Sequence, residues 1–178
     1  MLKQTEIQLS PLTAEQAQVV RKWRNSEHIR QFMDFKGHIT EEDQLRWFKS
    51  LKPDTDRYYF ILHQGEGIGL IHLNKIDKLN GDANAGLFIG KKEYHGTGAA
   101  YFASIKLLDE AFQELNLERV YAKVSERNPE AQAYNKSLGF EKVGTETSGF
   151  IKMVVTKKQY AQKKALLSKV LGLEDLPT

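Results

Sequence analysis

The chain has 178 residues and a mass of 20.4 kDa, which suits one domain, and 40% of its residues are apolar, enough to bury a single core. It contains no cysteine, which excludes disulfides, cysteine-ligated zinc, iron–sulfur clusters and thiol nucleophiles. A formal charge of +3 is too small to indicate a nucleic-acid partner. The chain has no apolar run of about 18 residues and no signal-peptide profile at its start, so we expect a cytoplasmic protein that does not enter a membrane.

Two helices are predicted near the N-terminus. The first begins after Thr13, because Gln16 three residues later completes a capping box. The second begins after Thr40 and ends before Pro53, which cannot continue a helix. The apolar positions that we expect to face the core are Ala17, Val20 and Trp23 in the first helix and Leu45, Phe48 and Leu51 in the second.

An antiparallel meander is predicted next. Residues 57–63 are rich in β-formers, and residues 68–76 alternate partly in the manner of a strand. The pair Asn80-Gly81 is typical of a hairpin turn, so residues 83–89 form the returning strand.

After Gly98 the pattern changes to alternating helices and strands. A long amphipathic helix comes first, then a strand over residues 119–125, a helix opened by Asn128 and closed by Gly139, and strands over 140–143 and 150–155. The apolar stripe of the long helix is Phe102, Ile105, Leu108, Phe112 and Leu115. Strand–helix–strand successions need crossover connections, hence some parallel pairing. The expected fold class is α/β (α+β), with a central mixed sheet flanked by helices.

The C-terminal segment is basic. Six lysines and no acids lie between Thr147 and Leu171, and a capping box at Thr156 and Gln159 predicts a further helix to residue 171. We therefore expect a domain over residues 1–156 and a basic helical extension over 157–178. A solvated helix is one interpretation of this extension. A homodimer contact is the other, through Tyr160, Leu167 and Leu171.

A glycine-containing turn precedes the long helix. Gly96 and Gly98 follow a strand and lead into a helix N-terminus, an arrangement in which main-chain N–H groups and the helix dipole favour an anion such as a pyrophosphate. A tight turn that merely needs a flexible backbone is the structural alternative. The turn is neither a dinucleotide fingerprint nor a P-loop, because the third glycine and the Gly-Lys-Ser/Thr sequence are missing.

A second informative stretch begins at Asn128. Ala131, Tyr134 and Leu138 share one helical stripe, so Tyr134 points with the core-facing side. A phenol there can protonate a leaving group of similar pKa, such as a thiolate. A packing tyrosine is the alternative.

Together the two stretches resemble the GNAT superfamily of acetyl-CoA-dependent N-acetyltransferases. The resemblance rests on Gly-x-Gly-x-Ala opening a long helix and on Asn-x-x-Ala-x-x-Tyr-x-x-x-Gly-Phe about 30 residues later. It extends from Leu9 to Val155 and implies one domain in which an antiparallel meander is followed by a splayed parallel strand pair.

The resemblance implies acetyl-CoA as the cofactor, no metal, and Tyr134 as the residue that protonates the departing thiolate. One departure is Glu93, where the family often has Gln or Arg; a carboxylate must turn away if the turn is to hold a diphosphate. The cofactor-binding residues implied are Leu87, Phe88, Ile89, Tyr94, His95, Gly96, Thr97, Gly98, Ala99, Ala100 and Asn128.

The N-terminal segment resembles the branch that acetylates nucleotide-linked amino sugars, and ribosomal-protein acetylating branches share much of its pattern. Two arginines of this segment suit a diphosphate, and its aromatic residues suit a base or sugar. The substrate-binding residues implied are Arg24, Asn25, Arg30, Phe32, Met33, Trp47 and His72. His72, Asp77 and Asp82 are the candidates for the general base, with transfer through water an equal alternative.

The sequence therefore predicts an enzyme that acetylates the primary amine of a small molecule, with a nucleotide-linked amino sugar as the preferred acceptor. Acetylation of a protein N-terminus or a polyamine is an alternative. A catalytically silent coenzyme A-binding module is an alternative of another class.

Overall fold

The computed structural model describes residues 2–171, so the end of the expected extension, residues 172–178, lies outside the described residues. Within that range, seven strands form one sheet in the order β1-β2-β3-β4-β5-β7-β6. The strands are β1 (Ile7–Pro11), β2 (Arg57–His63), β3 (Glu66–Asp77), β4 (Asp82–Ile89), β5 (Arg119–Ser125), β6 (Glu141–Glu146) and β7 (Phe150–Thr156). The α-helices are α1 (Ala14–Asn25), α2 (Glu27–Arg30), α3 (Glu41–Ser50), α4 (Ala99–Asp109), α5 (Pro129–Ser137) and α6 (Lys157–Leu171).

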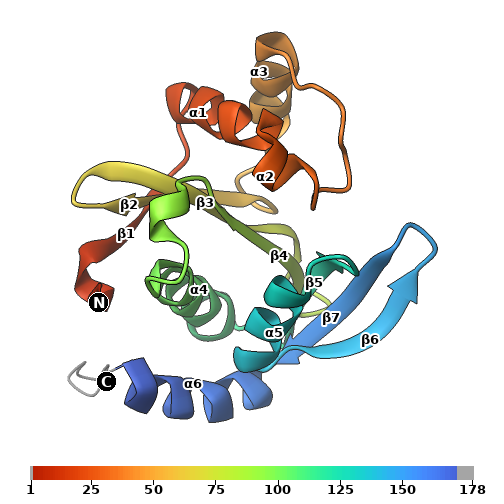
Figure 1. Ribbon diagram of the computed structural model, residues 1–178. Coiled ribbons are helices and arrows are strands. Elements are labelled where there is room, and N and C mark those ends of the chain that lie inside the picture. The colour runs from red at the N-terminus through yellow and green to blue at the C-terminus, as the bar shows by residue number, and fades with distance from the viewer. Residues whose placement is uncertain (1, 172–178) are drawn as a thin grey trace.

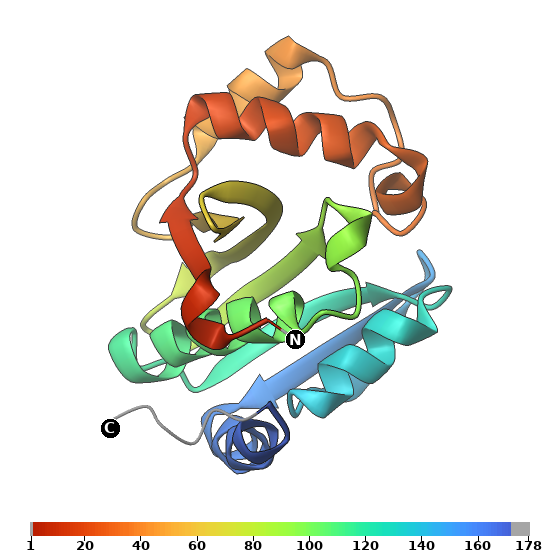
Figure 2. The same ribbon diagram turned by 60° about the vertical axis from the view of Figure 1, so that its left-hand side comes forward.

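Helices cover both faces of the sheet (Figures 1 and 2). Helices α1, α2 and α3 lie on one face, and α4, α5 and α6 lie on the other. Because side chains alternate across a strand, Phe60 and Leu70 pack with Val20 of α1, whereas the next residues, Ile61 and Ile71, join the larger core against α4. The sheet therefore separates two cores, and any site that reaches both faces must pass through it.

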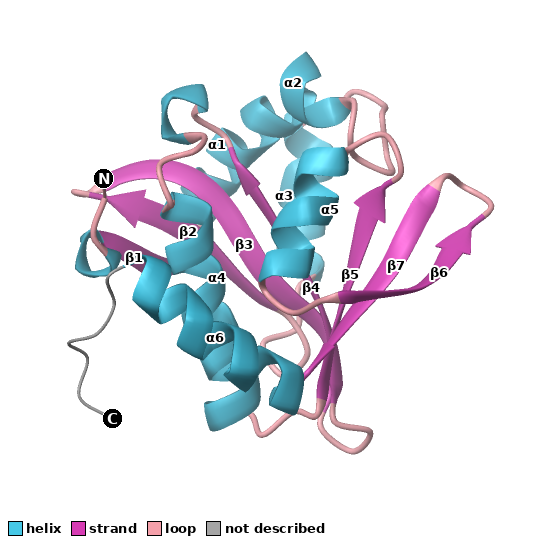
Figure 3. Ribbon diagram, turned by 60° about the horizontal axis from the view of Figure 1, so that its bottom comes forward, coloured by secondary structure: helices cyan, strands magenta, loops and turns pink. Residues whose placement is uncertain are grey.

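A parallel pair of strands provides that passage. Strand β4 pairs in parallel with β5 from Asp82↔Arg119 only as far as Ala85↔Ala122, although β4 continues to Ile89. On its other side β4 stays bonded to β3 as far as Ile89, which pairs with Gly69. Figure 3 shows the two strands close at one end and apart at the other. The edge of β4 beyond Ala85 thus has no strand partner among the described residues.

Local signals correctly predicted most element ends. Thr13 accepts a hydrogen bond from the Gln16 amide at 3.2 Å, and Asn128 Oδ1 accepts one from the Ala131 amide at 3.0 Å. The hairpin at Asn80-Gly81 is present, as is the mixed sheet with its parallel β4–β5 pair.

Other features differ from the sequence prediction. The short edge strand β1 and helix α2 were not predicted. The long helix continues after α4 as a π-helical turn over Glu110–Glu114. There the Glu110 carboxylate accepts hydrogen bonds from Arg57 and Tyr59. The expected inward stripe of α3 is wrong at Leu45, whereas Phe48 and Leu51 are half-buried. Leu45 is 38% exposed, and Gln44 is buried instead because its amide donates to the Ala17 carbonyl of α1 at 2.8 Å.

Helix α6 packs on the domain. Tyr160 is buried, and its hydroxyl donates to the Ile105 carbonyl and to Asp109 of α4, while Leu167 and Leu171 pack against the core. These three side chains contact the domain itself, and the homodimer contact stays a prediction. Between residues 2 and 171 no helix is long and apolar enough to cross a membrane.

Candidate active site

The first cleft opens where β4 leaves β5 and has a volume of about 720 Å³. Helices α4 and α5 form its other walls. The cofactor-binding residues predicted from sequence that line it are Leu87, Phe88, Ile89, Tyr94, His95, Gly96, Thr97, Gly98, Ala100 and Asn128. Ala99 is the exception, because its methyl group is fully buried in the core under α4. We call this hollow the donor cleft.

The turn at one end of the donor cleft combines two positive-φ glycines with the N-terminus of α4. Gly96 and Gly98 have φ values of 74° and 92°, a left-handed backbone that residues with a Cβ rarely adopt. Gly98 is also the N-cap of α4, and the first α-helical bond of α4 forms only at Phe102. The Ala99 amide donates to Thr97 Oγ1 at 3.4 Å, and the N–H groups of Ala100 and Tyr101 have no partner inside the helix. Thr97 braces the turn by donating to the Tyr94 carbonyl at 2.7 Å. Glu93 is exposed and does not line the cleft, so the carboxylate that departs from the family pattern stays outside the anion site.

Tyr134 lines the donor cleft from α5. Its hydroxyl donates to the Ala100 carbonyl at 2.9 Å, and the Ser104 hydroxyl lies 2.6 Å from the same oxygen. Because the single phenolic proton is used toward Ala100, Ser104 is the donor to Tyr134. Burial raises the pKa of Tyr134 well above its ordinary value, and the bond from Ser104 opposes that rise. The Tyr134 phenol is therefore protonated near pH 7, and the Ser104 hydroxyl is already placed to donate a hydrogen bond to the phenolate.

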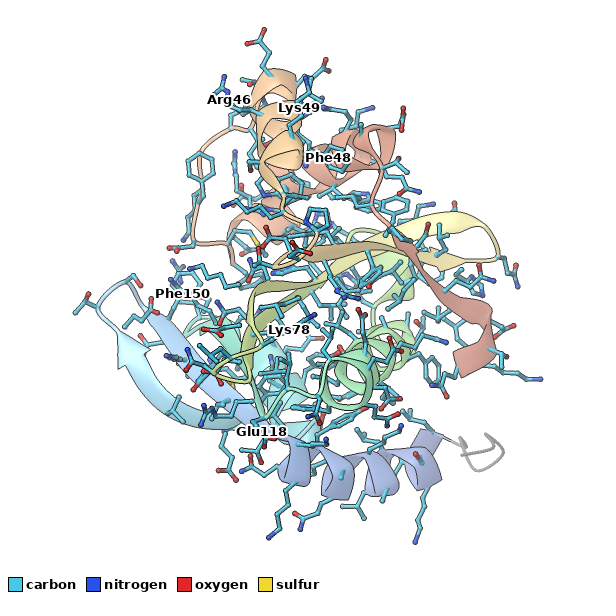
Figure 4. All side chains as sticks on the ribbon, turned by 180° about the vertical axis from the view of Figure 1, so that it is seen from behind. Arg46, Phe48, Lys49, Lys78, Glu118 and Phe150 are labelled. Carbon is cyan, nitrogen blue, oxygen red and sulfur yellow. The ribbon has the colours of Figure 1, made fainter. Side chains whose placement is uncertain are left out.

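The second cleft has a volume of about 1210 Å³ and lies between the sheet and α1 and α3. Residues 85–88, Ala122 and Lys123 line both clefts, so the two meet at the gap between β4 and β5. Phe32 and Met33, predicted to contact substrate, also line both. In Figure 4, seen from behind, the labelled Phe150 of β7 marks one wall. We call this hollow the acceptor cleft.

Aromatic rings form one wall of the acceptor cleft. The Tyr58 ring stacks on the imidazole of His72 with centroids 4.6 Å apart, and Trp47 meets Tyr58 edge-on at 5.0 Å. A Cβ at Gly86 would overlap the His72 ring, so the imidazole lies against the backbone of β4 where that strand leaves β5. Burial, and secondarily the charge of Arg24, lowers the pKa of His72 to about 4, so the ring is neutral near pH 7.

The remaining residues predicted from sequence lie in different places. Arg24, Trp47 and His72 line the acceptor cleft, whereas Asn25 and Arg30 line neither cleft. Asn25 holds both main-chain groups of Ile39, each at 2.9 Å, and Arg30 pairs with its neighbour Glu27 on α2.

Two acids considered as general bases lie away from the meeting point. Asp77 accepts from the Leu79 and Asn80 amides in the β3–β4 turn, and Asp82 pairs with Arg119 at 2.8 Å. Neither lines a cleft, and among the candidates only His72 does.

Sequence reasoning missed Ser104, Tyr58 and Lys123. Ser104 had a recognisable signal in the sequence, because it is a hydroxyl residue inside an otherwise apolar stretch. In the structure it is 7% exposed. Within residues 2–171, no group of three or more His, Asp or Glu side chains is placed to hold a metal ion.

The family model for the acetyltransferase (GNAT) domain matches residues 6–141, and the chain belongs to this family. It is 30% identical over 142 residues to the uncharacterized N-acetyltransferase p20 of Bacillus licheniformis, covering 76% of this chain and 79% of that protein. It is 31% identical over 121 residues to acetyltransferase PseH of Campylobacter jejuni, covering 67% and 73%. Spermidine N-acetyltransferase from Vibrio cholerae, solved with CoA and spermine, shares the fold with a TM-score of 0.79 at 20% identity, covering 88% of this chain and 99% of that one.

Proposed function

We propose that the protein transfers the acetyl group of acetyl-CoA to the primary amine of a nucleotide-linked amino sugar. The observation that carries the proposal is the meeting of the two clefts at the gap between β4 and β5, with the Tyr134 hydroxyl in the wall of the donor cleft. The N-terminal sequence pattern, which resembles the branch that acetylates nucleotide-linked amino sugars, supports this acceptor class.

The donor cleft fits a coenzyme in which an extended amide arm is attached to a diphosphate. The main-chain N–H groups at Gly96, Gly98 and the start of α4 would hold the diphosphate. The unpaired edge of β4 at 87–89 offers main-chain groups to an extended amide arm. When bound, acetyl-CoA supplies the thioester carbonyl for attack and a thiolate as the leaving group.

This chain's own residues orient the acceptor and move the protons. The neutral His72, beside Gly86, accepts a hydrogen bond from the attacking amine and receives its proton as the C–N bond forms and the C–S bond breaks. Tyr134 gives its phenolic proton to the departing sulfur, and the Ser104 hydroxyl stabilises the phenolate that results. Both proton transfers thus use side chains at or beside the gap between the strands.

A thiol-release assay tests the proposal. Purified protein with acetyl-CoA is offered UDP- and TDP-linked amino sugars, free amino sugars, spermidine and N-terminal peptides. We expect release that depends on a nucleotide-linked amino sugar. Release that follows spermidine or a peptide instead would refute the acceptor class. Binding of acetyl-CoA in a calorimeter with no release from any amine would favour a silent coenzyme A-binding module.

A further inference from the structure

Arg24 is a half-buried cation for which no carboxylate partner is found in the described part of the chain. It projects from α1 into the acceptor cleft, its Nε atom is buried without a hydrogen-bond partner, and no carboxylate of residues 2–171 lies within 4.0 Å of it. Burial lowers the pKa of this guanidinium, but an arginine remains charged at every physiological pH. A partly desolvated charge without a counter-ion still costs free energy, so its place in the wall of a cleft points to a ligand that supplies the counter-charge.

The other arginines do not show this arrangement. Each of five lies beside a carboxylate at 3.5 Å or less, and the remaining one, Arg127, is exposed. The five are Arg21, Arg30, Arg46, Arg57 and Arg119. Arg21 lies one turn before Arg24 on the same helix, and its side chain, 12% exposed, holds Glu41 at 2.9 Å. The missing partner is therefore particular to Arg24 and not a property of α1.

The acids of the acceptor cleft are already engaged. Lys123 pairs with Asp34 at 3.0 Å and with Glu146 at 2.7 Å. Asp43 accepts from the Thr40 hydroxyl at 2.7 Å at the start of α3. These are the three carboxylates that line the cleft.

The cations of the acceptor cleft form fewer ion pairs and hydrogen bonds than its carboxylates do. Lys75 and Lys152 line it with no carboxylate within 4.0 Å in the described part of the chain, and Lys152 lies over the Tyr121 ring at 4.6 Å. With Arg24, they leave the cleft with unpaired positive charge.

We propose that Arg24 is the anchor of an oxyanion site in the acceptor cleft, and that the acceptor carries a phosphate or a carboxylate as well as its amine. This rests on the proposed function, because it assigns the cleft to the acceptor. The planar guanidinium donates its N–H groups to two oxygens at once, which a lysine ammonium cannot match. Polycationic acceptors such as spermidine are disfavoured by the same charge.

The test measures anion binding directly, on the full chain saturated with coenzyme A, so that the diphosphate turn of the donor cleft is occupied. Calorimetry then follows inorganic pyrophosphate and, at equal ionic strength, acetate. We expect Arg24→Gln to weaken binding of the preferred anion by about 10- to 100-fold. Arg24→Lys should give an intermediate loss, because lysine keeps the positive charge but lacks the planar guanidinium that donates to two oxygens at once. Tighter binding of pyrophosphate identifies a phosphate group as the natural anion, and tighter binding of acetate identifies a carboxylate.

Arg21→Gln is the matched control, since it removes a half-buried arginine of the same helix that already has a partner. It should bind the anion as the wild type does. A second readout is the NMR signal of the Arg24 Nε–H group in wild-type protein, which should shift when the anion is added, independently of any variant's folding. Equal affinity of Arg24→Gln and wild type, or no shift of that signal, would overturn the proposal.

These outcomes are separable from failure of the proposed function. If the protein binds coenzyme A and pyrophosphate but acetylates no nucleotide-linked amino sugar, the oxyanion site stands and the acceptor assignment falls. If it acetylates such a sugar with unchanged KM in Arg24→Gln, the function stands and the oxyanion site falls.

Discussion

Replacing Tyr134 with phenylalanine removes one oxygen and leaves the ring in its place. In the structure that oxygen donates to the Ala100 carbonyl at 2.9 Å and accepts from Ser104 at 2.6 Å. Ser104 lies four residues after Ala100 on α4, so its hydroxyl can turn to that carbonyl when the phenol is lost. We therefore expect a loss of stability of only about 1 kcal/mol.

The expected loss of turnover is much larger. A positioned acid contributes about 100- to 10,000-fold, equivalent to about 3–5 kcal/mol of transition-state stabilisation. Ser104→Ala should have a smaller effect, because it keeps the acid and removes one hydrogen bond to the phenolate. A bond to a charged group is worth about 1.5–3 kcal/mol, so turnover should fall about 10- to 100-fold. In both variants the dissociation constant of acetyl-CoA should change little, since the diphosphate turn is untouched.

Single-turnover thiol release and calorimetry of acetyl-CoA binding separate these effects. Tyr160→Phe is the matched control, because it deletes a buried hydroxyl with two hydrogen bonds to α4 that lies outside both clefts. It should lose stability without losing turnover. A folded Tyr134→Phe protein with full turnover would refute the acid role, and a loss confined to acetyl-CoA affinity would make the residue a binding group.

Three further predictions concern the turn, the imidazole and a loop contact. Gly96→Ala should weaken coenzyme A binding about 5- to 30-fold in calorimetry, because it costs alanine about 1–2 kcal/mol to hold the left-handed backbone of the turn that would bind the coenzyme. Gly144→Ala is the control and should leave binding unchanged, since Gly144 is equally uncrowded but does not have a positive φ. The pKa of His72 is 6.5 in the unfolded chain and about 4 in the folded protein, so between these pH values the unfolded chain binds more protons. The free energy of unfolding should therefore fall as the pH drops from 6.5 to 4, and in urea titrations His72→Gln should make this fall smaller. Asn25→Ala should cost about 1–3 kcal/mol of unfolding free energy, because both Ile39 main-chain groups lose their partner; an unchanged urea midpoint would contradict this.

Much of the fold could be predicted from short-range pattern. Capping boxes at Thr13, Thr40 and Thr156 and the Asn128 cap each involve atoms three residues apart, so neighbouring letters specify them. The edge strand β1 has no such signal. It is five residues long and includes a proline, and it exists because β2 accepts it along one edge.

The candidate site was predicted unevenly for the same reason. The glycine turn and Tyr134 lie in stretches whose letters are distinctive on their own. Which arginine is left unpaired was not predictable, because Arg24 and Arg30 each lie three residues from Glu27 in the sequence. Only the structure shows that Glu27 pairs with Arg30 and that Arg24 lines the acceptor cleft.

The sequence by itself determined the order and ends of most helices and strands and the glycine turn, because each depends on residues within a few positions of one another. It also indicated the family, through two short motifs about 30 residues apart. Only the tertiary structure decided that Ser104 supports Tyr134, thirty residues away, and that His72 lies against Gly86 at the gap between β4 and β5. Such contacts depend on how the packed layers bring segments together that are distant in sequence. The same packing decides that Arg24 is left without a carboxylate partner.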